Sequence, residues 1–144
     1  MQPRKVLIID DSTLIHKLFR FTLPDRCLVF AANGVEALSR LSENPDVDLI
    51  FLDINMPRMN GLELLARLKA DQALAGIPVI VISTEGKEHD VVRGLQAGAA
   101  GYVRKPFGSV EITAMMARLP ASGDDDQTGD QTGDQRLPLA QNTS

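Results

Sequence analysis

Carboxylates stand at the ends of two apolar runs in the sequence. Asp10 and Asp11 follow the run of residues 5–9, and Asp53 follows the run of residues 49–52. If both runs are parallel strands, their carboxyl ends share one edge of a sheet and bring three acids together. Three uncompensated anions repel one another, so either their pKa values rise or a cation neutralises them. Such oxygen ligands suit Mg²⁺, although acids at strand ends are also common loop and capping residues.

Two further apolar runs lead into a hydroxyl group and a cation. Residues 78–82 precede Ser83 and Thr84, and residues 101–103 lead towards Lys105. A hydroxyl, an ammonium group and a metal ion are what the equatorial oxygens of a phosphoryl group require. Each residue alone is usually a cap or a solvated charge. Their common position at strand ends predicts a phosphoryl-transfer site at one edge of the sheet.

The elements that must position these side chains alternate along the chain. Apolar runs at residues 5–9, 28–31, 49–52, 78–82 and 101–103 are nearly continuous, as in parallel strands covered on both faces. A segment of helical apolar period follows each run. Ser12, Asn33, Asn60 and Ser109 stand near the expected helix starts as caps, and Gly98 follows the fourth helix. Five such repeats predict an α/β fold with a doubly wound, five-stranded parallel sheet and five helices.

Length and composition predict one folded domain followed by a tail. With 144 residues, of which 44% are hydrophobic, the chain can bury one core, which we place in residues 1–119. From Pro120 the composition turns to Ser, Gly, Asp, Gln and Thr, and Asp-Gln-Thr-Gly is repeated directly across residues 126–133. Residues 120–144 are therefore predicted to be a low-complexity, disordered tail or a linker to an output module.

Charge and cysteine content exclude several classes of protein. A formal net charge of -4 argues against a general nucleic-acid surface, and one cysteine rules out an internal disulfide. No secretory leader or apolar stretch of about 20 residues is present, so we expect a cytoplasmic protein without a membrane segment. We expect Cys27 to be a small buried hydrophobe, and His16 and His89 to be ordinary solvated or helix-surface residues.

Four motifs together resemble a known family. They are Asp10-Asp11, the run Asp-Ile-Asn-Met-Pro-Arg-Met-Asn-Gly at residues 53–61, Ser83, and the run Gly-Tyr-Val-Arg-Lys-Pro-Phe at residues 101–107. In combination they resemble the response-regulator receiver family of two-component signalling, and within it the single-domain chemotaxis regulators. The resemblance covers roughly residues 4 to 119. It implies a flavodoxin-like sheet with strand order 2-1-3-4-5.

The resemblance also implies roles for particular residues. Asp53 is the expected phosphoacceptor, and Ser83 and Lys105 are expected to bind the phosphoryl group. The implied Mg²⁺ ligands are Asp10, Asp11, Asp53 and the backbone carbonyl of Asn55, with Asp11 binding directly and Asp10 partly through water. The implied switch residues are Ser83 and Tyr102, and Asn55 and Glu85 are expected to tune a rapid hydrolysis. The peptide bond before Pro106 is typically cis in the family, and Thr84 replaces the family's usual Ala or Gly, which could narrow access to Asp53.

Partners follow from the same resemblance. The expected phosphodonor is a histidine kinase, and the expected output is a protein that binds the face formed by the fourth helix, fifth strand and fifth helix. A phosphatase is an optional further partner. The chain would catalyse only its own phosphorylation and dephosphorylation, so we do not expect an enzyme with a separate substrate.

Other classes of protein with this type of fold fit the sequence less well. An autonomous phosphatase or phosphotransferase with an aspartyl intermediate needs a substrate pocket, for which the short loops leave no place. A nucleotide-binding module would need a Walker A loop or a Gly-x-Gly-x-x-Gly turn after the first strand, and neither is present. Two alternatives stay open: a phosphorylation-independent interaction domain on the same fold, and the amino-terminal receiver of a larger regulator.

Overall fold

Strands and helices alternate along the whole of the described chain. The structure, a computed structural model, describes residues 3–56, 60–84 and 87–119. Within them the strands are β1 (Lys5–Ile9), β2 (Cys27–Ala31), β3 (Leu49–Asp53), β4 (Val79–Thr84) and β5 (Gly101–Lys105). The helices are α1 (Thr13–Thr22), α2 (Gly34–Glu43), α3 (Gly61–Ala70), α4 (Glu88–Gln96) and α5 (Ser109–Arg118). The predicted five strand–helix repeats are confirmed.

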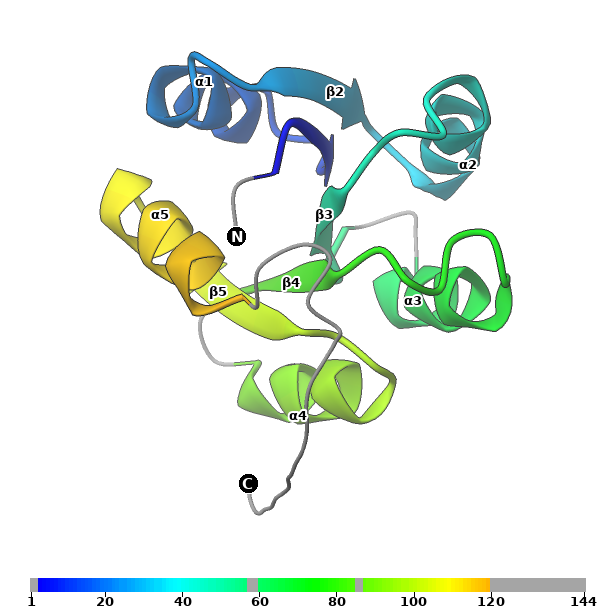
Figure 1. The fold of residues 1–144 in the computed structure, drawn as a ribbon. Coiled ribbons are helices and arrows are strands. Elements are labelled where there is room, and N and C mark those ends of the chain that lie inside the picture. The colour runs from blue at the N-terminus through cyan, green and yellow to red at the C-terminus, as the bar shows by residue number, and fades with distance from the viewer. Residues whose placement is uncertain (1–2, 57–59, 85–86, 120–144) are drawn as a thin grey trace. The chain divides into compact units, whose positions relative to one another are not determined.

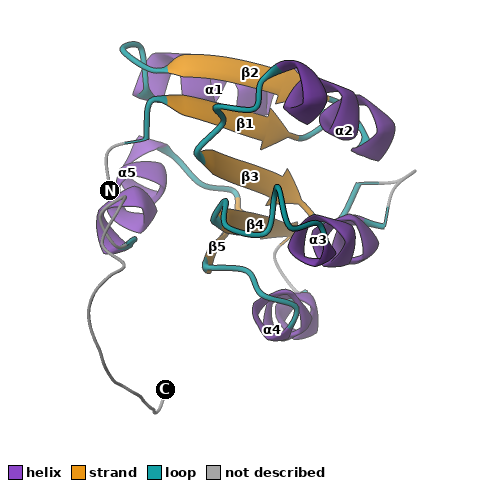
Figure 2. Cartoon of the chain, turned by 45° about the vertical axis from the view of Figure 1, so that its right-hand side comes forward, coloured by secondary structure: helices purple, strands orange, loops and turns teal. Residues whose placement is uncertain are grey.

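The strands form one parallel sheet in the order β2-β1-β3-β4-β5 (Figures 1 and 2). This is the predicted order. The register pairs Ile9 with Leu52, Asp53 with Ile82, and Thr84 with Lys105. Because these pairs lie at the carboxyl ends of their strands, the polar residues near the ends of β1, β3, β4 and β5 share one edge of the sheet.

Both faces of the sheet are covered by helices. Alternate residues of a strand point to opposite faces. Leu7 and Leu52 belong to a buried cluster that also contains Leu41 of α2 and Leu65 of α3. On the other face Phe51 packs edge-on against Phe19 of α1, with ring centroids 4.8 Å apart. Figure 1 shows α2 and α3 on one side of the sheet and α1 on the other, so the sheet is doubly wound.

Three of the four predicted helix caps are confirmed. Ser12, Asn33 and Asn60 each accept a hydrogen bond from a backbone N–H three residues later. Ser109 is instead the first residue of α5, and its hydroxyl lies 2.6 Å from that of Thr22. Beyond α4, Gly98 has a φ of 110°, a left-handed conformation that suits glycine at a helix end.

The prediction for Cys27 is wrong, because its side chain is exposed. Cys27 is the first residue of β2, and β2 pairs only with β1 at the edge of the sheet. An edge strand has a neighbour on one side only, so its first position gains little cover from the core. The apolar run indicated a strand but could not show that the strand lies at the edge.

Residues Pro3–Met115 form one compact unit, and Met116–Leu119 belong to a second unit. In the second unit the backbone N–H of Leu119 donates to the carbonyl of Met116 at 3.3 Å. The predicted tail of residues 120–144 lies outside the described residues, so it stays a prediction. Among the described helices, none combines the length and the apolar character that a bilayer crossing requires.

Candidate functional site

Three carboxylates meet at the carboxyl edge of the sheet. Asp10 directly follows β1, Asp11 comes next, and Asp53 ends β3; one oxygen from each lies within 4.8 Å of the others. Asp10 is 0% exposed and Asp53 is 3% exposed, whereas Asp11 is exposed. The backbone N–H of Ser12 donates to Asp10 Oδ1 at 2.9 Å, and that of Asn55 donates to Asp53 Oδ1 at 2.8 Å. The prediction that these three carboxylates lie close together is therefore confirmed.

Lys105 supplies the positive charge beside these acids. Its Nζ lies 3.0 Å from Asp53 Oδ2 and 3.2 Å from Asp10 Oδ2, and the side chain is 26% exposed. Burial by itself would lower the pKa of Lys105, but the hydrogen bond and charge of Asp53, together with Asp10, outweigh it and raise the pKa. Lys105 is therefore held in its charged form. The peptide bond to Pro106 is cis, as the resemblance implied.

One lysine does not neutralise the site. Burial is the main cause that raises the pKa of the Asp10 carboxyl, and repulsion from the Asp53 carboxylate raises it further. The hydrogen bond from the Ser12 N–H and the charge of Lys105 lower it, but they do not cancel the rise. Asp10 Oδ2 is buried and has no hydrogen-bond partner among the described residues, although Lys105 Nζ lies at ion-pair distance. A buried carboxylate oxygen without a hydrogen bond is costly, so this donor set fits a hard divalent cation such as Mg²⁺.

Ser83 brings a hydroxyl group to the same edge. It follows Ile82, the residue of β4 that pairs with Asp53, and it is fully buried. Among the described residues its Oγ has no hydrogen-bond partner. Since most buried polar groups are paired, a buried hydroxyl without a partner among the described residues is unusual, and Ser83 Oγ remains available to an acceptor. The neighbouring Thr84 is exposed, and β4 runs through both residues rather than ending before them.

Asn55 connects the acids to α4 in a way that sequence reasoning missed. Its side-chain Oδ1 accepts from the Thr84 N–H at 2.8 Å, and its Nδ2 donates to Asp90 Oδ2 at 3.0 Å. Asp90 belongs to the first turn of α4 and is half-buried. No spacing rule links a residue after the third strand to one 35 positions later, so only the folded chain could reveal this contact. Glu85, the other predicted tuning residue, lies outside the described residues.

Tyr102 stands on the strand beside Ser83. Its register partner is Val81 of β4, two residues before Ser83. The ring is half-buried and packs against the core cluster that includes Leu52 and Leu65. The Arg104 guanidinium carbon lies 5.9 Å from the ring centroid. This placement is compatible with the predicted switch role, which stays a prediction.

The two histidines differ in their surroundings. His89 is exposed, as predicted, but His16 is half-buried, and its Nε2 lies 2.7 Å from the backbone carbonyl of Asp10. The His16 ring also packs on Phe30, with centroids 4.5 Å apart. His16 therefore lies on a helix surface, as predicted, but its ring is partly covered rather than solvated. Helix α1 starts at residue 13, so its first turn carries His16 back towards the end of β1.

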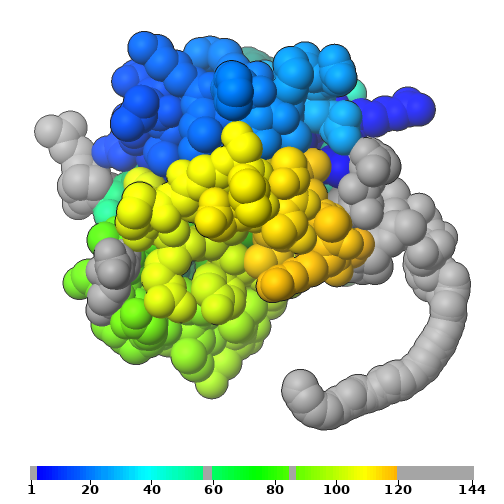
Figure 3. All heavy atoms as spheres, turned by 90° about the vertical axis from the view of Figure 1, so that its left-hand side faces the viewer, coloured from blue at the N-terminus to red at the C-terminus, as the bar shows by residue number. Residues whose placement is uncertain are grey.

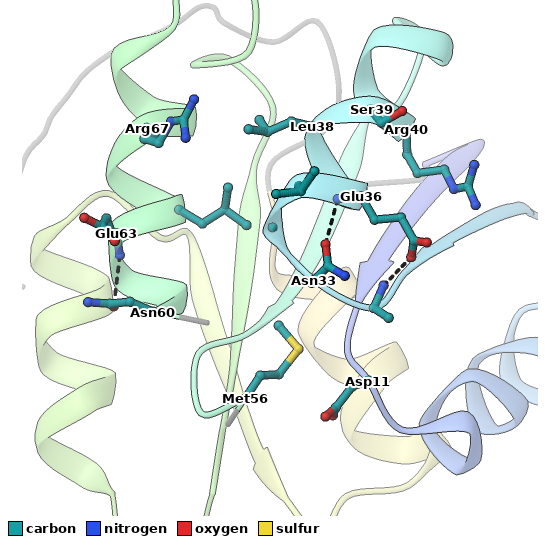
Figure 4. A pocket seen from close by; sticks show the side chains of 14 residues that line it. Asp11, Asn33, Glu36, Leu38, Ser39, Arg40, Met56, Asn60, Glu63 and Arg67 are labelled. Carbon is teal, nitrogen blue, oxygen red and sulfur yellow. Dashed lines mark hydrogen bonds between the residues drawn. The ribbon is translucent and has the colours of Figure 1, made fainter. Parts of the chain in front are cut away.

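A groove of about 1390 Å³ lies between α2 and α3, with Asp11 and Met56 at its lower end (Figure 4). The sequence had indicated no such hollow. Several of its polar side chains are already engaged: Asn33 caps α2, Asn60 caps α3, and Glu36 accepts from the backbone N–H of residue 32. The groove therefore borders the acidic site, and helix-capping side chains form part of its polar lining.

Comparison with known proteins assigns the family. The chain matches the response regulator receiver domain over residues 6–117. It is 39% identical to chemotaxis protein CheY1 of Helicobacter pylori over 106 residues, which is 72% of this chain and 86% of that protein.

Two solved structures resemble the fold closely. Chemotaxis response regulator CheY4 of Vibrio cholerae has a TM-score of 0.73 at 29% identity, covering 81% of this chain and 98% of that one. The Mn²⁺-bound form of response regulator Rcp1 has a TM-score of 0.67 at 30% identity, covering 78% and 88%. With a parallel sheet in the order 2-1-3-4-5 and an acidic edge, the chain belongs to the receiver-domain family of two-component response regulators and is CheY-like.

Proposed function

We propose that Asp53 accepts a phosphoryl group from a histidine kinase. The observation that carries this proposal is the fully buried hydroxyl of Ser83, which has no partner among the described residues and lies at the same sheet edge as a buried carboxylate and a lysine. A phosphoryl group on Asp53 would bring the acceptor oxygens that Ser83 lacks and that Lys105 can also bind. Kinases that act on chemotaxis regulators are the natural donors for a CheY-like chain.

The transfer needs little beyond positioning and charge. A carboxylate oxygen of Asp53 attacks the phosphorus of the donor phosphohistidine, the P–O bond forms, and the P–N bond breaks. The imidazole of the donor keeps the electron pair of that bond and takes a proton from solvent. Asn55 N–H holds the other oxygen of Asp53, while Lys105 and Ser83 bind the equatorial oxygens of the transferred group.

The acids would hold a magnesium ion. We assign Asp10, Asp11 and Asp53 as carboxylate ligands, with Asp10 acting partly through water, and the backbone carbonyl of Asn55 as a further ligand. A bound Mg²⁺ supplies positive charge that neutralises the acids and the transferred oxygens. The support is the cluster of three carboxylates and the buried Asp10 Oδ2, which has no hydrogen bond within the described part of the chain. The family relative Rcp1 has been solved with Mn²⁺ bound.

The output would be a protein that binds the face formed by α4, β5 and α5. Added phosphoryl oxygens draw Ser83 inward, and Tyr102 rotates into the space that is left. Figure 3 shows α5, in yellow, crossing the surface between α1 and the green helix α4. Exposed apolar side chains are available there, since Val92 and Leu95 of α4 and Val110 of α5 are all exposed. A phosphatase is an optional second partner, and we propose no nucleic acid or membrane partner.

The phosphorylated state would be short-lived. Asn55 and Glu85 occupy the positions that tune hydrolysis in the family, and we propose that they favour rapid return to the free carboxylate. The chain would then act only on its own Asp53, without a separate substrate. A short-lived phosphoryl group suits a signal that must end soon after its kinase stops donating.

The direct test is the intact mass of the purified chain after incubation with phosphoramidate, with and without Mg²⁺. We expect a single phosphoryl adduct that requires Mg²⁺, is absent from Asp53→Asn, and persists in Asp46→Asn, an exposed acid outside the site. No adduct, in parallel with a receiver that is labelled under the same conditions, would refute phosphorylation by small donors. Failure of a histidine kinase to label it as well would favour the phosphorylation-independent interaction domain.

A further inference from the structure

The side chain of Asn55 is held at both ends. Its Oδ1 accepts a hydrogen bond from the Thr84 N–H, and its Nδ2 donates to Asp90 Oδ2. A backbone N–H can only donate and a carboxylate can only accept, so these two partners together allow one orientation of the carboxamide. The backbone N–H of the same residue donates to Asp53 Oδ1. Asn55 thus joins the phosphoacceptor, the end of β4 and α4.

Asp90 is placed to be the anchor of this arrangement. It lies in the first turn of α4, and its side chain is 15% exposed. The helix begins after Lys87, whose side chain makes no capping hydrogen bond to the residues that the structure describes. Asp90 uses Oδ2 for Asn55, while its Oδ1 lies 3.4 Å from the exposed His89. Among the described residues, the Asp90–Asn55 bond is therefore the side-chain tie between the start of α4 and the acidic site.

We propose that Asp90 is a positioning residue for hydrolysis of the aspartyl phosphate. It acts through Asn55 by keeping the carboxamide in one orientation beside Asp53. In hydrolysis a water oxygen attacks phosphorus, the P–O bond to Asp53 breaks, and a water proton passes to the departing inorganic phosphate. A carboxamide held in place orients that water, whereas a freely turning one does so less often. This inference rests on the proposed phosphorylation of Asp53.

The kinetic test compares hydrolysis rates of the phosphorylated chain in Mg²⁺ buffer. We expect Asp90→Ala to slow hydrolysis roughly three- to tenfold, because the water loses an orienting group. Asp90→Asn keeps an oxygen acceptor for Asn55 Nδ2, so it should stay within about twofold of the parent rate. Glu88→Ala is the matched control: it removes an acid from the same helical turn, but Glu88 is exposed and pairs with Arg104. It should leave the rate unchanged.

A double-mutant cycle shows whether Asp90 acts through Asn55. In an Asn55→Ala background, Asp90→Ala should change the rate less than about 1.5-fold, because the group that Asp90 positions is gone. An equal effect in both backgrounds would overturn the proposal. So would an unchanged rate in Asp90→Ala alone.

A measurement without donor or metal separates this proposal from the phosphorylation itself. In ¹⁵N spectra we expect the Asn55 side-chain NH₂ to be protected from exchange in the parent and in Asp90→Asn, and to lose protection at least tenfold in Asp90→Ala. If the chain takes no phosphoryl group, the proposed function fails while this link still stands. If the NH₂ is equally unprotected in the parent, the positioning role fails whatever the phosphorylation result.

Discussion

Replacing Asp10 with asparagine should stabilise the metal-free protein. Asp10 is fully buried, and burial, the leading cause, raises the pKa of its carboxyl, with repulsion from Asp53 adding to the shift. The charged carboxylate is therefore less favourable in the folded protein than in the unfolded chain. An amide has the same shape and can still accept the hydrogen bond from the Ser12 N–H. What Asp10→Asn loses is the ion pair with Lys105, which keeps its contact with Asp53.

The size of the effect follows from these terms. Relieving a desolvated charge while losing one partly exposed ion pair should raise the free energy of unfolding by about 1–2 kcal/mol. For a domain of about 110 residues, this corresponds to roughly 4–8 °C in Tm. Mg²⁺ at 100 times its Kd should stabilise the parent by about 2.7 kcal/mol and stabilise Asp10→Asn far less. The order of stability should therefore reverse when Mg²⁺ is added.

The pH dependence of stability gives a second check on whether Asp10→Asn stabilises the protein. A carboxyl with a raised pKa binds its proton more tightly in the folded state, so ionisation costs stability as pH rises through its ordinary value of 3.8 towards the folded pKa. The advantage of Asp10→Asn should accordingly be small below pH 3.8 and grow above it. Asp11→Asn is the control, since Asp11 is exposed: without metal its effect should stay within about 0.5 kcal/mol.

Urea denaturation at several pH values, with and without Mg²⁺, measures all of these quantities. A lower free energy of unfolding for Asp10→Asn than for the parent, at neutral pH without metal, would refute a destabilising charge at Asp10. Equal stabilisation of both proteins by Mg²⁺ would refute the role of Asp10 as a metal ligand.

Three further predictions follow from the same structure. Ser83→Ala removes a buried hydroxyl that has no partner among the described residues, so it should change the free energy of unfolding by less than about 1 kcal/mol. The same variant should slow phosphorylation by phosphoramidate about tenfold or more. A large loss of stability would show that the hydroxyl is paired. Lys105 has a raised pKa, so its contribution to stability is present below pH 10.5 and is lost as pH rises through its folded pKa. Lys105→Met should therefore flatten the alkaline part of a plot of the free energy of unfolding against pH. An unchanged plot would contradict the ion pairs of Lys105. Gly61→Ala would push a Cβ against the backbone of Ile54 and to 2.9 Å from the Asp53 carbonyl oxygen, so it should lower the free energy of unfolding by about 3 kcal/mol. In the control Gly76→Ala the new Cβ meets nothing within 4 Å, and the free energy of unfolding should not change. Equal effects of the two substitutions would refute the close packing at Gly61.

Much of the fold and the outline of the site could be predicted from the sequence. Continuous apolar runs alternating with helical stripes allow few arrangements other than a parallel sheet with helices on both faces. Since the carboxyl ends of parallel strands share an edge, Asp10, Asp53, Ser83 and Lys105 could be placed together before any contact was known. Their positions depend on local periodicity and chain direction, both of which are written in short stretches of sequence.

Only the tertiary structure decided which atoms meet and which remain unpaired. The bond from Asn55 to Asp90 and the contact of His16 with the Asp10 carbonyl join residues on different elements. The exposure of Cys27 and the full burial of the Ser83 hydroxyl depend on which strands are neighbours and how helices cover them. Periodicity states which face a side chain takes. It carries no information about the partner across that face, because the partner is set by the packing of the whole domain.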